Sequence, residues 1–339
     1  MNNRLPVFLI VAVILPRLFP LASAMAQTAA NFPQPSPSAN DTAKQLPADV
    51  RKLYDYDANQ PLDLQMTRLY ERDGHTVFDV TYISPRGGRV PAYLVVPSGK
   101  GPFAGIVFGH WGNGNRTEFL PEAELYAQAG VVSILPAYPW TRPAPWFRGI
   151  HPPEKPEEDL VTQAQAVVDL RRAFDVLLAR PDVDSKRLAY VGHSYGAQWG
   201  AILMAVDQRM KTAVLVGGVP TMASVVLESD NPELSRFQSG PARKAAEEYI
   251  RVMSVQDAIR YIPYHAPIPV LFQFARFEQY AKESASEKYY DAATEPKRQK
   301  WYNTGHDLND LQVLLDRAAW LEKEIRMQDV ASLLQKQIR

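Results

Sequence analysis

The sequence contains no cysteine. This absence excludes disulfide bonds, cysteine-ligated zinc, iron–sulfur clusters and a thiol nucleophile. The chain also lacks an excess of either charge, because 37 Lys and Arg residues balance 37 Asp and Glu residues. A net charge of zero argues against nucleic acid as a partner and against an acidic tail. The six histidines never recur at the i, i+4 spacing of a helical zinc site, so we expect neither a metal ion nor a cofactor.

The first 26 residues have the three features of a secretory signal peptide. Arg4 makes the start basic, and Leu5–Pro16 is a run without charges that is shorter than the roughly 20 residues of a membrane-spanning helix. Small residues follow in A-x-A patterns that end at Ala24 and Ala26. We expect cleavage after Ala26, with Ala24 as the second choice, and a periplasmic or secreted protein without membrane contact. An uncleaved membrane anchor is the alternative.

The remaining sequence divides into a leader and one α/β domain. Residues 27–47 are rich in Pro, Ser, Ala and Asn, which predicts a flexible leader. Residues 48–339 alternate short apolar runs with segments of helical spacing, a pattern typical of helices on both faces of a mostly parallel sheet. The predicted strands are Thr76–Ile83, Val90–Val96, Ala104–Gly109, Val131–Leu135, Leu188–Val191, Ala213–Val216, Pro269–Phe274 and Lys300–Tyr302. The predicted helices are Glu118–Ala129, Leu160–Leu178, Gln198–Val206 and Leu308–Met327, the last capped by Asp307.

The first two predicted strands depart from the parallel arrangement. They alternate apolar and polar residues, and Pro85-Arg86-Gly87-Gly88 joins them, which predicts a hairpin. We therefore expect a mostly parallel twisted sheet with an antiparallel N-terminal hairpin at its edge.

One motif carries chemistry. Residues 188–197 read LAYVGHSYGA, which is an apolar strand followed by G-x-S-x-G and the start of a helix. This arrangement forces an abrupt strand-to-helix turn that exposes the middle residue, Ser194, and leaves no room for a Cβ at Gly192 or Gly196. The Tyr195 N–H and the helix dipole then face any negative charge that develops at Ser194. The pattern predicts a nucleophilic serine; the alternative is a glycine-rich turn with a solvated serine.

A nucleophilic serine needs a base and an acidic residue that orients the base. Only His265 and His306 follow Ser194, and His306 lies in a loop expected at the carboxyl edge of the sheet. We therefore predict His306 as the base and place His265 at the opposite edge. The acid should follow the next-to-last strand, which favours Glu278. Four other acids in the interval remain as alternatives: Asp257, Glu283, Glu287 and Asp291.

Glycines also mark the loop after the strand Ala104–Gly109. Residues 109–116 read GHWGNGNR, and such a loop can point backbone N–H groups at a bound oxyanion. The expected oxyanion donors are the amide of Tyr195 and the amide of Gly112 or Trp111. A merely flexible loop is the alternative.

Two segments are candidates for covering the site. Residues 136–156 are rich in proline and aromatic side chains, so Tyr138, Trp140 and Trp146 are candidate substrate contacts. Residues 219–262 form a mostly helical insert and a candidate cap. Aromatic residues of a loop pack equally well into a core, and the charges of the insert fit a solvated face.

The segment from Arg180-Pro181-Asp182-Val183-Asp184 into Gly192-His193-Ser194-Tyr195-Gly196 resembles the α/β-hydrolase superfamily. The nearest branches are the dienelactone-hydrolase-like, acetyl-xylan-esterase-like and prolyl-oligopeptidase-type catalytic domains, and the similarity covers residues 76–325. The resemblance implies Ser194 as the nucleophile, His306 as the base and Glu278 as the acid. The HG-x loop of the family matches His110-Trp111-Gly112, which implies Gly112 as an oxyanion donor.

Three features depart from these branches. A serine stands where dienelactone hydrolases proper use cysteine, Glu278 stands where Asp is usual, and Trp111 replaces a glycine. Together with the motif, the resemblance implies a serine hydrolase that cleaves small carboxylic esters through an acyl-enzyme. The alternatives are a serine peptidase or amidase of the prolyl-oligopeptidase type and a non-catalytic binding protein on the same fold. The sequence does not fix the oligomeric state.

Overall fold

The computed structural model describes residues 46–337 of the chain. The predicted signal peptide (residues 1–26) and all but the end of the predicted leader (residues 27–47) lie outside the described residues. Within that range, the first helical turns are α2 (Ala48–Arg51) and η1 (Lys52–Tyr54). None of the helices in this range combines the length and the apolar composition that crossing a bilayer requires.

A nine-stranded sheet runs through the described part of the chain in the spatial order β1-β2-β3-β5-β4-β6-β7-β8-β9. Its strands are β1 (Gln65–Arg72), β2 (His75–Ile83), β3 (Arg89–Pro97), β4 (Phe103–Gly109), β5 (Val131–Pro136), β6 (Val183–His193), β7 (Thr212–Val216), β8 (Val270–Phe277) and β9 (Lys297–Gly305). β1, β2 and β3 pair antiparallel, as do β3 and β5, and every later pair is parallel. The predicted mostly parallel sheet with an antiparallel N-terminal hairpin is confirmed.

The burial of each strand explains whether its position could be predicted from the sequence. β5 and β7 are buried throughout, so they read as short apolar runs without alternation. The hairpin of β2 and β3 closes where Gly87 and Gly88 adopt φ values of 97° and 79°, which side chains disfavour. The prediction missed β1, because every residue of this edge strand is exposed and no buried face imposes a pattern on it.

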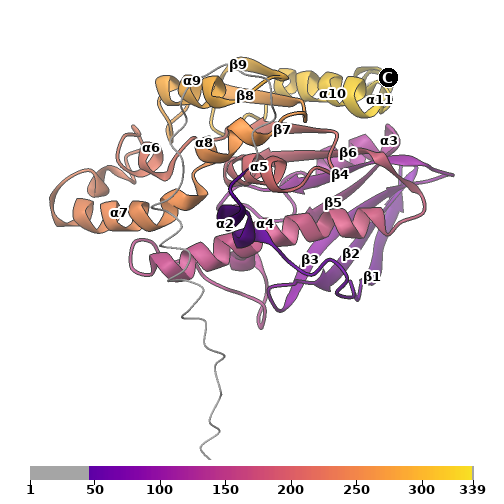
Figure 1. Cartoon of the computed structure of the whole chain (residues 1–339). Helices are drawn as coiled ribbons and strands as arrows, with labels where there is room; N and C mark the ends of the chain where they lie inside the picture. The colour runs from indigo at the N-terminus through magenta and orange to yellow at the C-terminus, as the bar shows by residue number, and fades with distance from the viewer. Residues whose placement is uncertain (1–45, 338–339) are drawn as a thin grey trace, which may run out of the picture.

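Helices cover both faces of the sheet (Figure 1). α4, α5 and α8 pack into one buried cluster, and α3, α10 and α11 pack into another. The helices are α3 (Leu120–Gln128), α4 (Pro156–Leu178), α5 (Tyr195–Val206), α6 (Met222–Val226), α7 (Gly240–Met253), α8 (Ala258–Tyr261), α9 (Glu283–Ala292), α10 (Leu311–Ile325) and α11 (Val330–Gln337). The short 3-10 turns are η2 (Pro139–Thr141), η3 (Ser235–Phe237), η4 (Ser254–Gln256) and η5 (Ile262–Tyr264).

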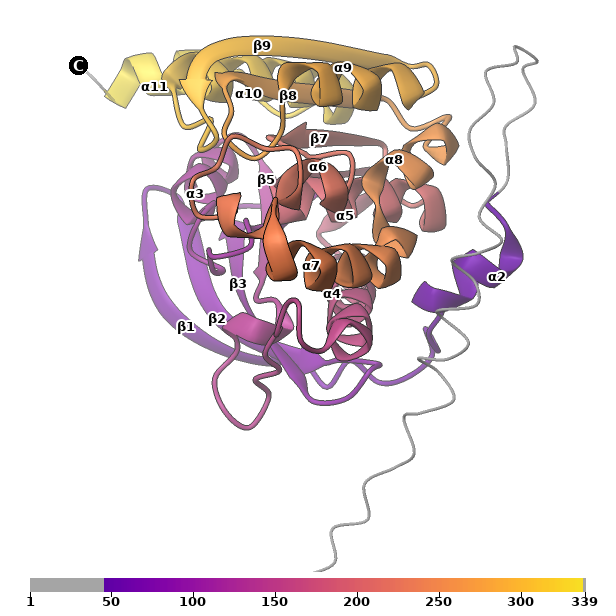
Figure 2. The same ribbon diagram turned by 90° about the vertical axis from the view of Figure 1, so that its left-hand side faces the viewer.

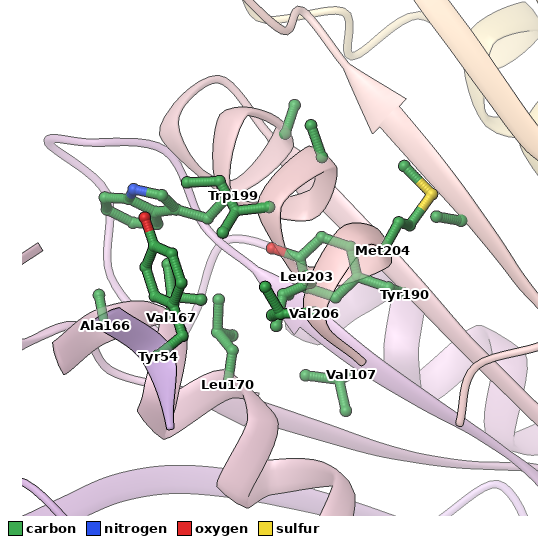
Figure 3. Packing of buried hydrophobic residues seen from close by; sticks show 14 of the residues in the cluster. Tyr54, Val107, Ala166, Val167, Leu170, Tyr190, Trp199, Leu203, Met204 and Val206 are labelled. Carbon is green, nitrogen blue, oxygen red and sulfur yellow. The ribbon is translucent and has the colours of Figure 1, made fainter. Parts of the chain in front are cut away.

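The larger core forms between α4, α5 and the sheet (Figure 3). Val167 and Leu170 of α4 point toward Trp199 and Leu203 of α5, and Tyr190 of β6 lies beside Leu203. All five side chains are fully buried, and the burial of Val167, Leu170 and Leu203 contributes about 1.5–3 kcal/mol each. This packing fixes α5, and with it the turn that precedes α5.

Three helix starts differ from the prediction in ways that affect the site. α5 begins at Tyr195, directly after Ser194, and α3 begins at Leu120, which leaves Glu118 in the preceding loop. α10 begins at Leu311, so the predicted cap, Asp307, lies in an exposed turn before the helix. Asp310 occupies the N-cap position without a side-chain hydrogen bond. The prediction that Asp307 caps this helix is therefore wrong.

The order of the strands creates a crevice. β4 lies between β5 and β6, so the chain leaves the carboxyl end of β4 in one direction and that of β6 in the other. Ligands bind at such switch points in open α/β sheets. Figure 2 shows α6 and α7 in front of the strands, turned toward the viewer. α7 contacts both α6 and α4.

Candidate active site

The turn between β6 and α5 holds Ser194 in a strained backbone conformation. Its φ is 55° and its ψ is −113°, a combination that L residues rarely adopt. A Cβ at Gly192 would collide with the carbonyl oxygen of Gly196, and a Cβ at Gly196 would collide with that of Gly109. The Ser194 N–H donates to the carbonyl of Val216 at 2.8 Å, which anchors the turn to the neighbouring strand. Both glycines of the motif are therefore required by sterics.

Ser194, His306 and Glu278 form a continuous chain of hydrogen bonds. The Oγ of Ser194 lies 2.9 Å from Nε2 of His306, and Nδ1 of His306 lies 2.7 Å from Oε2 of Glu278. A carboxylate only accepts, so Nδ1 carries the imidazole proton and Nε2 accepts from the serine hydroxyl. The side chains of His306 and Glu278 are 4% and 9% exposed. The structure thus brings together the three residues that the sequence singled out.

Two parallel strands deliver the acid and the base. β8 extends to Phe277, so Glu278 is the first residue beyond it, and His306 directly follows β9. The second carboxylate oxygen of Glu278 accepts the Tyr280 N–H at 2.8 Å, which fixes the orientation of the carboxylate. The ring of Tyr280 packs edge-on against His306 at a centroid distance of 4.6 Å.

The alternative acids and the other histidine make contacts elsewhere. Asp257 accepts the Met222 N–H at 2.8 Å, and burial raises the pKa of its carboxyl to about 7. Glu283 pairs with Arg276. Glu287 and Asp291 are exposed on α9. His265 is fully buried, with its two ring nitrogens 2.7 and 2.8 Å from the carbonyls of Ile268 and Thr294.

The loop after β4 contains the two amides, Trp111 and Gly112, that the sequence leaves as alternative oxyanion donors. The Trp111 N–H donates to Oε2 of Glu118 at 2.7 Å, so this amide is occupied. The amides of Gly112 and Tyr195 have no acceptor among residues 46–337, and both residues line the same cavity as Ser194. Of the two candidate amides in this loop, the Gly112 N–H can therefore donate to a bound ligand, whereas the Trp111 N–H already donates to Glu118.

Aromatic residues of the segment 136–156 hold this loop from behind. Nε1 of Trp140 donates to the Gly112 carbonyl at 2.8 Å. His110 packs on Tyr138 at a centroid distance of 3.8 Å, and its Nδ1 lies 2.6 Å from the Trp111 carbonyl. Burial lowers the pKa of His110 to about 3, so the ring is neutral at ordinary pH and donates from Nδ1.

A cavity of about 290 Å³ opens onto Ser194 and His306. About half of its lining comes from the insert 219–262, chiefly apolar side chains of α6, η3 and α7. Among residues 46–337, the only lining residue with a permanent charge is Arg236 on η3. The polar side chain of Gln198, one turn after Ser194 on α5, also borders the cavity. The predicted cap segment thus lies over the site.

None of the three predicted substrate contacts lines this cavity. Tyr138 is buried against His110 and Trp199, and Trp140 supports Gly112. Trp146 packs on Gly88 in the β2–β3 hairpin. Their role as substrate contacts stays a prediction; in the structure Tyr138 and Trp140 pack against the loop 109–116. Pro152 and Pro153 are the residues of this segment that reach the cavity.

The sequence reasoning missed two residues next to the site, Glu118 and His193. The sequence predicts a helix that starts at Glu118, whereas the structure leaves Glu118 in the loop before α3, and His193 is a variable position of the G-x-S-x-G motif. One feature of the sequence points to His193: it directly precedes the candidate nucleophile, Ser194, and is therefore close to the site.

Comparisons with known proteins identify the architecture. No family model matches the chain. Among solved structures, an acetyl xylan esterase from Paenibacillus sp. R4 is 20% identical with a TM-score of 0.68, covering 88% of this chain and 99% of that chain. A putative dienelactone hydrolase from Klebsiella pneumoniae is 18% identical with a TM-score of 0.52, covering 74% and 98%. Two prolyl endopeptidases were solved in a further study; one such chain is 18% identical with a TM-score of 0.55, covering 75% and 39%.

These similarities show that the chain has the α/β-hydrolase fold, as the sequence predicted. One curated protein also matches in sequence, the acyl-coenzyme A amino acid N-acyltransferase 2 of Mus musculus. It is 29% identical over 161 residues, which is 44% of this chain. The match spans about a third (34%) of the length of that relative.

Proposed function

We propose that this chain is an exported serine hydrolase that cleaves small carboxylic esters through an acyl-enzyme. The observation that carries the proposal is the hydrogen-bond chain from Ser194 through His306 to Glu278 at the floor of an apolar cavity. Similar folds described as an acetyl xylan esterase and a dienelactone hydrolase support ester cleavage. The signal-peptide pattern of residues 1–26 supports export.

In the first half of the reaction, Ser194 Oγ attacks the ester carbonyl carbon while Nε2 of His306 takes the hydroxyl proton. The buried Glu278 stabilises the imidazolium that forms. The amides of Gly112 and Tyr195 donate to the oxyanion of the tetrahedral intermediate, and the dipole of α5 adds to this field. The C–O bond then breaks, and the alcohol leaves with the proton from His306.

In the second half, His306 activates a water molecule that attacks the acyl-enzyme. The acid is released and Ser194 regains its proton, so one ester and one water give one acid and one alcohol. The apolar wall from α6 and α7 favours an ester with an apolar group, because burying such a group contributes roughly 25 cal/mol per Å².

Labelling with a fluorophosphonate tests the proposal. We expect the mature protein to form an adduct at Ser194, located by mass spectrometry, and both Ser194→Ala and His306→Ala to abolish it. A folded protein that is not labelled would contradict the proposal and favour a binding protein on the same fold. Matched p-nitrophenyl ester and p-nitroanilide substrates distinguish an esterase from a peptidase or amidase. If the protein is an esterase, the ratio of its kcat/KM for the ester to that for the anilide should exceed the ratio of their uncatalysed hydrolysis rates.

A further inference from the structure

A second histidine–carboxylate pair lies beside Ser194, and the reaction proposed above does not use it. Nδ1 of His193 is 2.5 Å from Oε1 of Glu118, and Nε2 of His193 is 2.9 Å from the backbone carbonyl of His306. The other carboxylate oxygen of Glu118 accepts the Trp111 N–H at 2.7 Å. Glu118 and His193 therefore connect the loop after β4 (residues 110–119) to the loop after β9 that carries His306.

The protons of this pair are determined by its partners. The His306 carbonyl can only accept, so Nε2 of His193 carries a proton. Nδ1 of His193 and Oε1 of Glu118 share a short hydrogen bond of 2.5 Å. The side chains of His193 and Glu118 are 4% and 20% exposed, so water competes weakly for these bonds.

The two loops are also closely packed at this point. The His193 and His306 rings lie 5.1 Å apart between centroids. Gly217 packs closely against both residues, because a Cβ at this position would lie 3.3 Å from the His306 carbonyl oxygen and 3.4 Å from the His193 ring. On the far side, Glu118 and His193 border a second cavity of about 390 Å³. The hydrogen bonds of Glu118 and His193, together with this close packing, therefore hold the two loops at a fixed distance.

We propose that Glu118 and His193 are positioning residues that act as one unit, holding the Gly112 amide and the His306 ring at matched distances from Ser194. The inference rests on the proposed function. Holding Trp111 through its amide fixes the peptide that precedes Gly112, and holding the His306 carbonyl fixes the backbone from which the imidazole extends. A displacement of about 1 Å in either group is enough to slow the chemical step about 100-fold.

Substitutions at Glu118 separate positioning from a purely structural role. Glu118→Ala removes both hydrogen bonds. Glu118→Gln preserves them, because its amide oxygen accepts from Trp111 and its amide nitrogen donates to the unprotonated Nδ1 of a neutral His193. The matched control is Leu321→Ala on α10, which removes a fully buried side chain far from the reacting groups and costs about 2–5 kcal/mol of stability.

Each variant is measured three ways: the rate of fluorophosphonate labelling, kcat and KM for p-nitrophenyl acetate, and the thermal midpoint. We expect Glu118→Ala to lower the labelling rate and kcat about 10- to 100-fold with KM within about twofold, since Glu118 itself does not line the cavity and about half of the lining comes from the insert 219–262. Glu118→Gln should retain kcat within about threefold. Leu321→Ala should lower the midpoint while leaving kcat unchanged well below it.

A second variant keeps the inference falsifiable if Glu118→Ala does not fold. His193→Phe keeps a ring of similar size and removes both bonds, so it should lower kcat by a similar factor. In the double variant with Glu118→Ala, the losses should not multiply, because both substitutions break one unit.

Three results would overturn the inference. Labelling of Glu118→Ala and His193→Phe at the wild-type rate would show that the pair does not position the site. Equal losses in Glu118→Ala and Glu118→Gln would show that the hydrogen bonds themselves are not what matters. A wild-type protein that is not labelled at all would instead refute the proposed function, and the inference would fall with it.

Discussion

Substituting Gly112 by alanine tests the oxyanion geometry directly. A Cβ at this position would overlap the Cδ2 atom of the Tyr195 ring and lie 2.6 Å from its Cε2 atom. Ordinary carbon–carbon contacts are about 3.5–4.0 Å, so the loop or the ring must move by about 1 Å. The Tyr195 ring packs against Trp140 and Trp199 at centroid distances of 6.2 and 5.3 Å, and these contacts resist its displacement. The loop is therefore the part that moves.

The expected cost follows from what the loop carries. Moving the Gly112 amide by about 1 Å weakens its hydrogen bond to the oxyanion, and removal of one such donor lowers kcat by roughly 10²–10³, or about 3–4 kcal/mol. We expect Gly112→Ala to lower kcat for p-nitrophenyl acetate about 100-fold with little change in KM. Circular dichroism and the thermal midpoint would verify that the fold is retained.

A double-mutant cycle identifies the cause. Tyr195→Ala removes the ring that the new Cβ would meet and keeps the Tyr195 backbone amide, so Gly112→Ala should cost much less in that background. The reasoning is refuted if Gly112→Ala retains kcat within about threefold in the folded protein. It is also refuted if the substitution costs the same with and without the Tyr195 ring.

Two further predictions concern acidic residues. Glu278→Gln should lower kcat by up to about 10⁴-fold, because an amide cannot stabilise the His306 imidazolium, whereas the exposed Asp291→Asn should leave kcat unchanged; the reverse result would move the acid to Asp291. Asp257, whose pKa burial raises from 3.8 to about 7, stays protonated in the folded state over a range in which the unfolded chain ionises, so stability should fall as pH rises from about 4 to 7. Between about pH 5 and 8 this decrease should amount to about 2.7 kcal/mol, and Asp257→Asn should remove it, as measured by urea unfolding at the two pH values; identical pH slopes in both proteins would contradict the prediction.

The identity of Ser194 could be read from the sequence because its geometry is local. The strand, the turn and the helix that expose it occupy one continuous segment, β6 to α5, and the two glycines report collisions that any chain making this turn would suffer. His306 followed by elimination, since only one other histidine lies downstream. Glu278 followed from chain order, because the loop after β8 emerges beside the loop after β9 in a parallel sheet.

The boundaries of elements were harder to predict where burial did not impose a pattern. The exposed edge strand β1 has no inward face, so its sequence does not alternate. The start of α10 depends on the turn after His306, where Leu308 adopts a φ of 44°, and the acidic residue nearest the histidine does not cap the helix. Such choices are made by tertiary contacts that outweigh local propensity.

The sequence by itself determined the fold class and the three residues of the proposed triad, because strand periodicity, the glycine pair and chain order are properties of short segments. Three features were decided by tertiary structure alone. The Trp111 amide is bound to Glu118, and Tyr138 and Trp140 pack against the loop after β4. Residues of the insert 219–262 line the cavity. The physical reason is that whether an amide or a ring faces a ligand depends on which distant residues fill the space around it.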